Sequence, residues 1–375
     1  MIFEMGILSA RKGKKLGILL AVFWIGTLCY IWLPDHIPDF LSSKTKSEKS
    51  AKLPKLNLML HAGVSSNTSQ LSNVDSNETV HVCISSDQRT LGGMVTLINS
   101  IVSNTKSRVK FHLVVDEESA DRVSIWLRKS KLADIDFQVK VFPLNWVDGK
   151  IKIRGGRKEL GSPLNYARYY LPRLFPQLKE RIVFIDDDCI VQGDIKELYE
   201  TPIKEGHWAA FSEDCGGINK RLTRLSNVYA EFLDFKNEHV QKLALKPTAC
   251  SFNTGVFVSD LSVWQKNNIT TQLEYWMELN TKEEVYGNER GGGGSQPPMM
   301  IVFYNKYSPI DLMWHVRQLG ATAGSSYSKS FIQKAKLLHW NGPLKPWNRI
   351  AQHSYAWDKY FVPEPSAQFK VLRRT

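Results

Sequence analysis

From residue 81 onwards, short apolar stretches alternate with stretches whose apolar residues recur every three or four positions. The short stretches are typical of buried β-strands, and the others are typical of amphipathic α-helices. Strands are predicted over residues 81–85, 109–115, 136–142 and 181–186, and helices over residues 92–105, 121–132 and 163–175. The alternation predicts an α/β domain whose mostly parallel sheet carries helices on both faces.

The pattern becomes less regular after the fourth predicted strand. The sequence predicts a helix over residues 195–200 and strands over residues 207–212 and 255–261. Residues 261–305 are largely helical in pattern, but four glycines and a serine at 291–295 interrupt them. We interpret that run as a loop, although such runs also occur as cloning linkers. Because ligands of such sheets bind at the carboxyl ends of the strands, functional residues are expected there.

A separate apolar run at the N-terminus, residues 16–33, contains no charged residue. Its eighteen residues are at the lower end of the length that crosses a bilayer as a helix. The basic residues at positions 11, 12, 14 and 15 hold the N-terminus in the cytosol by the positive-inside rule. A cleaved signal peptide would need a shorter apolar core and a small-residue cleavage site. Because the run ends in Tyr30, Trp32 and Leu33, we predict an uncleaved signal anchor.

The segment after the predicted anchor is rich in Ser, Lys and Asn and has little hydrophobic periodicity. Such composition is typical of flexible linkers. The predicted organisation is therefore a cytosolic tail at 1–15, a transmembrane anchor at 16–33, a lumenal stem at 34–79 and a folded domain at 80–375. Contact with the membrane is expected only through residues 16–33.

Two further features agree with a lumenal domain. Sequons at Asn67, Asn77 and Asn268 lie beyond the anchor and are candidate sites of N-glycans. The net charge is +12, of which residues 1–56 contribute +5, from nine Lys and Arg against four Asp and Glu. The remaining +7 suits an anionic ligand. Nucleic acid is excluded as a partner because it is absent from the compartment that the topology implies.

The five cysteines are too few for a disulfide scaffold. Cys29 lies in the predicted anchor, and Cys83 and Cys189 lie in predicted buried strands, where a free thiol behaves as a small hydrophobic group. Cys215 and Cys250 lie in loop-like sequence. In an oxidising lumen these two are the candidate disulfide pair.

Residues 181–191, RIVFIDDDCIV, run from an apolar strand directly into three aspartates. Because side chains alternate along a strand, Asp186 and Asp188 project to one side and Asp187 projects to the other. Two carboxylates at a strand end form a hard oxygen site for Mn²⁺ or Mg²⁺, typically together with a diphosphate. The alternative interpretation is an acidic turn after an edge strand.

A second motif, LLHWNGPLKPW, occupies residues 337–347. An apolar strand delivers His339, Gly342 permits close approach of the backbone, and Lys345 precedes a proline that stiffens the turn. A neutral imidazole is a suitable third ligand for Mn²⁺, and an ammonium group is a suitable point charge for a diphosphate. Each residue taken alone is more often structural.

Through these motifs, residues 81–363 resemble glycosyltransferase family 8. The resemblance is greatest to the animal members of that family. The resemblance implies a Rossmann-like GT-A fold, a UDP-sugar donor, retention of anomeric configuration and a Golgi membrane protein with a lumenal catalytic domain. It implies that Mn²⁺, with Mg²⁺ as the alternative, is held by Asp186, Asp188 and His339. The implied donor-binding residues are Ser85, Ser86, Asp87, Arg89, Arg168, Asp187, Gly255, Gly342 and Lys345.

The implied catalytic residues at the sugar are Asp214, Asn253 and Gln296. Asp214 is open to two interpretations, a contact with donor sugar or acceptor and an acidic loop residue. Around Gln296 the sequence departs from the family, because SQPPMMIVFY stands where better-known members carry an Asp-Gln element. The donor-sugar contacts of those members therefore do not transfer to this position.

Together these features predict a Mn²⁺-dependent retaining hexosyltransferase with a glycan, protein or lipid acceptor. Two alternatives remain at the level of sequence. A catalytically silent Golgi protein could bind the nucleotide without transferring sugar. A metal-dependent phosphohydrolase could use the same acidic pair, but it leaves the motif at 337–347 unexplained.

Overall fold

The structure is a computed structural model that describes residues 78–155, 158–215, 227–287, 294–321 and 327–373, all within one compact unit, residues 72–375. The predicted tail, anchor and stem up to residue 77, with Asn67 and Asn77, lie outside the described residues. Most of the glycine run at 291–295 also lies outside them. None of the helices in the described part is long and apolar enough to cross a membrane.

Among the described residues, seven strands form the central sheet in the order β3-β2-β1-β4-β7-β6-β8. The strands are β1 (Val80–Ser86), β2 (Val109–Val115), β3 (Asp136–Val141), β4 (Arg181–Ile185), β6 (Ala209–Glu213), β7 (Phe252–Asp260) and β8 (Tyr307–Pro309). β1 to β4 are parallel to one another, whereas β7 runs antiparallel between β4 and β6, and β8 is parallel to β6. The sheet is mostly parallel, as the sequence predicts.

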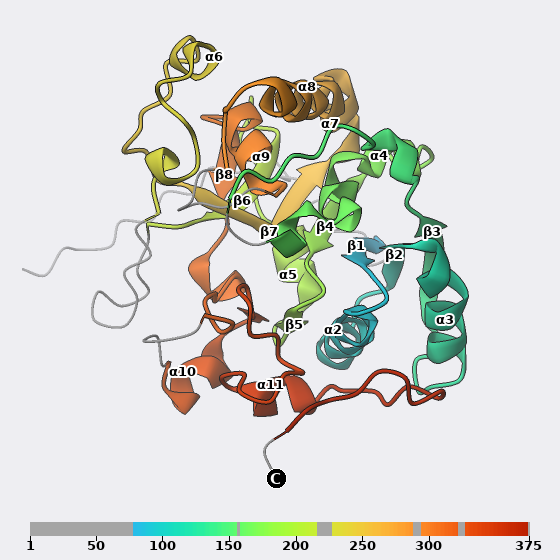
Figure 1. Cartoon of the computed structure of the whole chain (residues 1–375). Coiled ribbons are helices and arrows are strands. Elements are labelled where there is room, and N and C mark those ends of the chain that lie inside the picture. The colour runs from blue at the N-terminus through green and yellow to red at the C-terminus, as the bar shows by residue number, and fades with distance from the viewer. Residues whose placement is uncertain (1–77, 156–157, 216–226, 288–293, 322–326, 374–375) are drawn as a thin grey trace, which may run out of the picture. The chain divides into compact units, whose positions relative to one another are not determined.

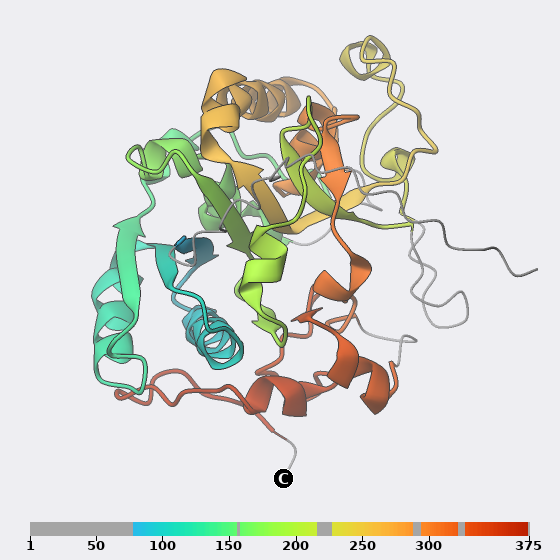
Figure 2. The same ribbon diagram turned by 180° about the vertical axis from the view of Figure 1, so that it is seen from behind.

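The period of two along the strands divides the core between the two faces of the sheet. In β4, Val183 and Ile185 pack on one face, and Ile182 and Phe184 pack on the other. The first face is covered by α2 (Leu91–Asn104), α3 (Glu117–Arg128) and α5 (Ile195–Tyr199). The second is covered by α7 (Leu261–Lys266), α8 (Ile269–Lys282) and α9 (Gln296–Val302), as Figures 1 and 2 show from opposite sides.

One predicted helix differs in the structure. Residues 163–175 form a 3₁₀ helix, η3 (Pro163–Tyr169), followed by a single α-helical turn, α4 (Leu171–Leu174). Proline has no N–H and cannot donate to the carbonyl four residues earlier, so Pro172 interrupts a helix continuing from Arg168. Within the 3₁₀ helix, the guanidinium of Arg168 lies over the ring of Phe184, 4.5 Å from its centroid.

A two-stranded sheet joins two segments that lie far apart in sequence. β5 (Cys189–Val191) pairs antiparallel with β9 (Leu337–His339), so that Cys189 lies opposite His339. The remaining described helices are short: η1 (Leu144–Trp146), η2 (Lys158–Gly161), η4 (Tyr229–Glu231), α6 (Glu238–Gln241), η5 (Leu312–Trp314), α10 (Lys329–Lys334) and α11 (Ser354–Asp358).

The chain after α11 runs back along α2 and α3 (Figure 1). The Asn99 side chain of α2 donates to the Tyr360 carbonyl over 2.6 Å. The Arg122 side chain of α3 forms an ion pair with Glu364, with 2.5 Å between Nε and Oε1. These contacts tie the C-terminal segment to the helices that begin at the carboxyl edge of the sheet.

Candidate functional site

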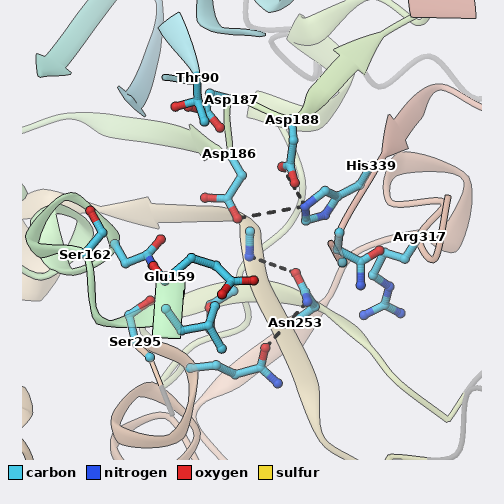
Figure 3. A pocket seen from close by; sticks show the side chains of 18 of the residues that line it. Thr90, Glu159, Ser162, Asp186, Asp187, Asp188, Asn253, Ser295, Arg317 and His339 are labelled. Atoms are coloured by element: carbon cyan, nitrogen blue, oxygen red, sulfur yellow. Dashed lines mark hydrogen bonds and ion pairs between the residues drawn. The ribbon is translucent and has the colours of Figure 1, made fainter. Parts of the chain in front are cut away.

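A cavity of about 670 Å³ opens at the carboxyl ends of β1 and β4 (Figure 3). All the site residues predicted from the sequence line it. They are Ser85, Asp87, Arg89, Arg168, Asp186, Asp187, Asp188, Asp214, Asn253, Gly255, Gln296, His339, Gly342 and Lys345. A volume of this size lies within the range of small-molecule sites.

Three backbone segments bring the carboxylates and the imidazole together. Asp186 follows β4, and its N–H donates to the Gly255 carbonyl of β7 over 2.7 Å. Asp188 precedes β5, and its carbonyl accepts from the Trp340 N–H over 3.0 Å. His339 is the last residue of β9. Because β5 and β9 are paired at that point, Asp188 and His339 meet although about 150 residues separate them in sequence.

The imidazole of His339 lies close to both carboxylates. Nε2 of His339 lies 2.9 Å from Oδ1 of Asp188 and 3.9 Å from Oδ2 of Asp186. Oδ1 of Asp188 is buried and faces this imidazole nitrogen. Buried carboxylates are costly unless they are paired with positive charge, and a cation held between these atoms would supply that charge. Asp186, Asp188 and His339 are therefore the residues that could hold a metal ion.

Cys189 also lies within reach of Asp188 and His339. Burial, reinforced by the neighbouring carboxylates, raises the pKa of its thiol well above the ordinary value. Sulfur is in addition a softer ligand than a carboxylate oxygen. We therefore take Asp186 rather than Cys189 as the third candidate ligand, which also suits a hard cation.

Two cations compensate the acidic pair. Nζ of Lys345 lies 2.5 Å from Oδ2 of Asp188, and Nη2 of Arg168 lies 2.6 Å from Oδ1 of Asp186. Burial alone would raise the pKa of Asp188, but Lys345 and His339 outweigh it and hold that pKa below the ordinary value. At Asp186 burial prevails over Arg168 and raises the pKa. Arg168 thus positions a carboxylate instead of presenting a free guanidinium to the cavity.

Asp187 faces the opposite way, toward the start of α2 (Figure 3). Burial raises its pKa to about 8, although hydrogen bonds from Ser86 and Thr90 act in the other direction. The hydroxyls of Ser86 and Thr90 lie 2.9 Å apart and complete this polar cluster. Asp187 therefore connects β4 to the turn after β1, and its side chain does not join Asp186 and Asp188.

The turn after β1 forms one end of the cavity. Oδ1 of Asp87 accepts from the Arg89 N–H over 2.9 Å, and Oδ2 lies 3.2 Å from Nη2 of Arg89. The Arg89 side chain is three-quarters exposed. Beyond the acidic pair, Oδ1 of Asn253 accepts from the Gly255 N–H over 2.9 Å, and its amide nitrogen approaches Oε1 of Gln296 at 3.5 Å. The cavity thus has polar groups at both ends and charge at its centre.

Comparison with known proteins identifies the family. Residues 81–351 match the family model described as glycosyl transferase family 8. The chain belongs to glycosyltransferase family 8. Glycosyltransferase 8 domain-containing protein 1 of Homo sapiens is 44% identical over 301 residues, which cover 79% of this chain and 81% of the relative. Glycosyltransferase 8 domain-containing protein 2 of Macaca fascicularis is 42% identical over 363 residues, which cover 96% and 98%.

Solved structures agree with this membership at the level of the fold. A crystal structure of the galactosyltransferase LgtC with donor and acceptor sugar analogues has a TM-score of 0.54 and 15% identity, covering 75% of this chain and 95% of that one. The apo structure of the bifunctional glycosyltransferase WbbM has a TM-score of 0.55 and 21% identity, covering 77% and 50%. The predicted GT-A-like α/β fold is confirmed.

In this family 8 domain, Asp214 is enclosed by partners. Its carboxylate accepts from Nη1 of Arg317 and, over 2.7 Å, from the Ser251 hydroxyl. Arg317 also donates to the Ser212 and Glu213 carbonyls over 3.3 and 2.5 Å. Both carboxylate oxygens of Asp214 are thus engaged, which favours a structural role over a direct contact with sugar.

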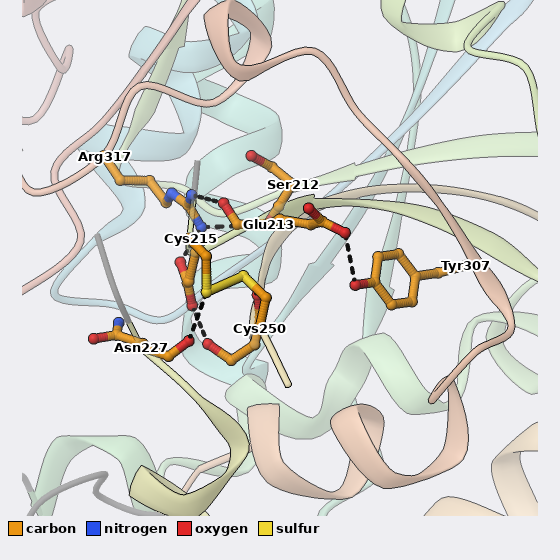
Figure 4. Close-up of a disulfide and its surroundings, with 9 residues drawn as sticks. Ser212, Glu213, Cys215, Asn227, Cys250, Tyr307 and Arg317 are labelled. Atoms are coloured by element: carbon orange, nitrogen blue, oxygen red, sulfur yellow. Dashed lines mark hydrogen bonds and ion pairs between the residues drawn. A yellow bond between two sulfur atoms is a disulfide. The ribbon is translucent and has the colours of Figure 1, made fainter. Parts of the chain in front are cut away.

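The predicted cysteine pair adjoins Asp214 in the chain, and Figure 4 shows it close to Glu213 and Arg317. The sulfur atoms of Cys215 and Cys250 are 2.34 Å apart, and their Cα atoms are 5.5 Å apart. That Cα separation is within the range of disulfides. Because Cys215 follows Asp214 and Cys250 precedes Ser251, the pair brackets the hydrogen bond between those two side chains.

Two site residues were not predicted from the sequence. Arg317 lines the cavity, and His315 lies behind His339 with its Nε2 2.8 Å from Nδ1 of His339. Burial, assisted by the charge of Arg317, lowers the pKa of His315 well below its ordinary value. The segment MWHVRQL carries the available signal, because a histidine and an arginine both interrupt an otherwise mostly apolar run. Charged and polar groups in such positions are normally paired.

Gly255 leaves room for the acidic pair, which gives a first prediction. A methyl group at this position would lie 2.5 Å from Oδ2 of Asp186 and 2.5 Å from Cε1 of His339. Gly255→Ala should displace both side chains and weaken Mn²⁺ binding by about 10-fold or more, as loss of supporting geometry does at metal sites. Electron paramagnetic resonance of free Mn²⁺ measures the affinity.

The control is Gly161→Ala. A methyl group at Gly161 meets the flexible Ile153 side chain at 3.0 Å and no candidate ligand. Mn²⁺ affinity should stay within about threefold of wild type in this variant, because the metal site is untouched. An unchanged affinity in Gly255→Ala would mean that the metal site lies elsewhere.

Proposed function

We propose that this family 8 glycosyltransferase is a Mn²⁺-dependent, retaining hexosyltransferase that takes its sugar from a UDP-sugar. Mg²⁺ is the alternative cation, and the acceptor is a glycan, protein or lipid. One observation carries the proposal: two carboxylates, an imidazole and an ammonium group converge in the same cavity as the polar turn after β1. That combination provides for a metal-bound diphosphate at the centre and a nucleoside at one end.

The leaving group requires charge stabilisation. When bound, the cation would neutralise the diphosphate and make UDP a viable leaving group. Asp186, Asp188 and His339 would hold the cation. The ammonium group of Lys345 lies 2.5 Å from Oδ2 of Asp188. From there it would stabilise the negative charge that develops as UDP departs. Gly342, at a positive φ of 121°, lets the chain turn between His339 and Lys345.

The nucleoside would occupy the end formed by the turn after β1. Ser85 and Asp87 line this end, and the exposed Arg89 side chain is free to move onto the ligand from its contact with Asp87. The sugar would then occupy the far side of the acidic pair, beside Asn253 and Gln296. These two amides can donate to and accept from sugar hydroxyls.

We propose same-face attack by the acceptor within an ion pair as the route to retention of configuration. Asn253 and Gln296 are amides, and Arg317 and Ser251 occupy the oxygens of Asp214. A double displacement needs a carboxylate beneath the anomeric carbon, and these three side chains do not supply a free one. Departure of UDP would leave an oxocarbenium-like sugar for the acceptor hydroxyl. A covalent sugar adduct trapped by mass spectrometry would overturn this route.

We further propose that the protein is a single-pass type II protein of the Golgi membrane, anchored by residues 16–33. The basic residues before the apolar run support a lumenal domain. The distance between Cys215 and Cys250, which is within the range of disulfides, supports it as well. Asn268, exposed at the start of α8, is the proposed N-glycan site within the described domain. Protection of the domain from protease in sealed microsomes checks the orientation, and full digestion would contradict it.

The donor is tested by thermal shift of the full-length protein with a panel of UDP-sugars in Mn²⁺. A ligand that binds only the folded state at 100 times its Kd stabilises it by about 2.7 kcal/mol, so a clear rise in Tm is expected with the correct donor. UDP-galactose and UDP-glucose are the first donors to test, followed by UDP-galacturonate. No shift with any UDP-sugar would contradict the proposed donor class.

Hydrolysis of the same donors separates transfer from binding alone. Glycosyltransferases of this kind are expected to release UDP slowly to water when the acceptor is absent, because the same leaving-group stabilisation operates. A stabilised protein that releases no UDP, with or without candidate acceptors, would instead support a catalytically silent nucleotide-binding protein.

A further inference from the structure

His315 is a buried histidine that the proposed mechanism does not use. Its side chain is 1% exposed. Its Nε2 lies 2.8 Å from Nδ1 of His339, and the two rings are nearly parallel, with 9° between their planes. Its other ring nitrogen, Nδ1, is buried with no hydrogen-bond partner among the described residues. The single polar contact that the structure gives to this side chain is therefore the one to His339.

The backbone holds the two rings in register. The Val316 N–H donates to the Leu337 carbonyl over 3.0 Å, and the His339 N–H donates to the Val316 carbonyl over 2.8 Å. Val316 and Leu338 also form a parallel bridge. His315 and His339 thus project from neighbouring extended segments that cannot slide past each other without breaking these bonds.

The contact between the rings contains one shared proton. Two neutral imidazoles can form it in two ways, with Nδ1–H of His339 donating to His315, or with Nε2–H of His315 donating to His339. In the first arrangement Nε2 of His339 presents its lone pair to Asp188. In the second, Nε2 of His339 carries a proton and cannot bind a cation. The position of this proton therefore decides whether His339 can act as a ligand.

We propose that His315 is a positioning residue that accepts the Nδ1–H of His339 and thereby directs the Nε2 lone pair of His339 toward Asp186 and Asp188. This inference rests on the proposed metal site. The acceptor fixes both the tautomer and the orientation of the ring, as partners behind metal-binding histidines commonly do. A carboxylate is not required for this role, because the unprotonated nitrogen of a neutral imidazole also accepts a hydrogen bond.

Two substitutions at this position separate hydrogen bonding from packing. His315→Phe keeps a planar ring of similar size but removes the acceptor, so Mn²⁺ affinity should fall by about 10–100-fold. His315→Gln retains an amide oxygen that can accept from Nδ1 of His339 and should stay within about threefold of wild type. Titration of the full-length protein with Mn²⁺, followed by electron paramagnetic resonance of the free ion, measures both variants.

A spectroscopic measurement reports the tautomer directly. In full-length protein labelled with ¹⁵N-histidine and saturated with diamagnetic Mg²⁺, the His339 signals should show a proton on Nδ1 and none on Nε2. His339→Asn identifies the signals. A proton on Nε2 of His339 in the wild-type protein would overturn the proposal, as would equal Mn²⁺ affinities for the Phe and Gln variants.

Asp188→Asn in the same Mn²⁺ titration distinguishes an error in the proposed role of His315 from an error in the proposed metal site. If Asp188→Asn loses Mn²⁺ binding while His315→Phe binds like wild type, the role of His315 is refuted and the metal site stands. If Asp188→Asn binds like wild type, the metal site is misplaced, and the proposed function and the role of His315 both fail.

Discussion

Asp188→Asn is expected to abolish Mn²⁺-dependent sugar transfer, lowering kcat/KM by about 10³-fold or more. The substitution keeps the shape of the side chain but removes the negative charge that faces both His339 and Lys345. A bound metal supplies several kcal/mol of charge stabilisation in the transition state, and each 1.4 kcal/mol is about a factor of ten in rate. UDP release measured over a range of Mn²⁺ concentrations tests this.

The matched control is the neighbouring carboxylate. Asp187 faces Ser86 and Thr90, and burial already raises its pKa to about 8. Asp187→Asn therefore replaces a group that is largely neutral at pH 7, and the Mn²⁺ dependence of UDP release should change by less than about threefold. If the two variants lose Mn²⁺ dependence equally, the alternation of side chains at this strand end is not what selects the ligands.

Arg317→Met is expected to lower the free energy of unfolding by about 3–5 kcal/mol, the usual cost of removing one partner of a buried ion pair. Arg317 and Asp214 have side chains that are only 1% and 5% exposed. Without the guanidinium, the Asp214 carboxylate keeps only the Ser251 hydroxyl as a hydrogen-bond partner among the described residues, and the Ser212 and Glu213 carbonyls lose the hydrogen bonds from Arg317. Thermal and urea unfolding of the full-length protein measure the loss.

A double variant shows whether the uncompensated charge causes the loss. Replacing both partners by apolar residues of similar size, as in Arg317→Met with Asp214→Leu, should recover part of the stability, because no buried charge then remains. An unfolding free energy within about 1 kcal/mol of wild type in Arg317→Met alone would show that the pair is no more important than an exposed salt bridge.

Local pattern accounts for the four parallel strands β1 to β4 of the sheet. β2 coincides with the predicted strand at 109–115, and β1, β3 and β4 lie within a residue or two of theirs. β1, β2 and β4 are largely buried on both faces, so their apolar runs are strong signals, whereas β3 is half-buried at the edge of the sheet. The segment at 163–175 was harder to predict from the sequence. Its apolar periodicity is that of an α-helix, but Pro172 interrupts the α-helical hydrogen bonding of the backbone. Periodicity reports which side chains are buried, and hydrogen bonding decides the helix type.

The sequence by itself determined the candidate ligands, because a strand end with alternating aspartates and a strand-borne histidine have local signatures. It also determined the family. Only the tertiary structure decided which other groups surround these side chains. Arg168 was expected at the donor but holds Asp186, Asp214 was open between two roles but is enclosed by Arg317, and His315 supports His339. Each contact joins segments far apart in sequence, and spacing along a chain carries no information about which buried charges will meet.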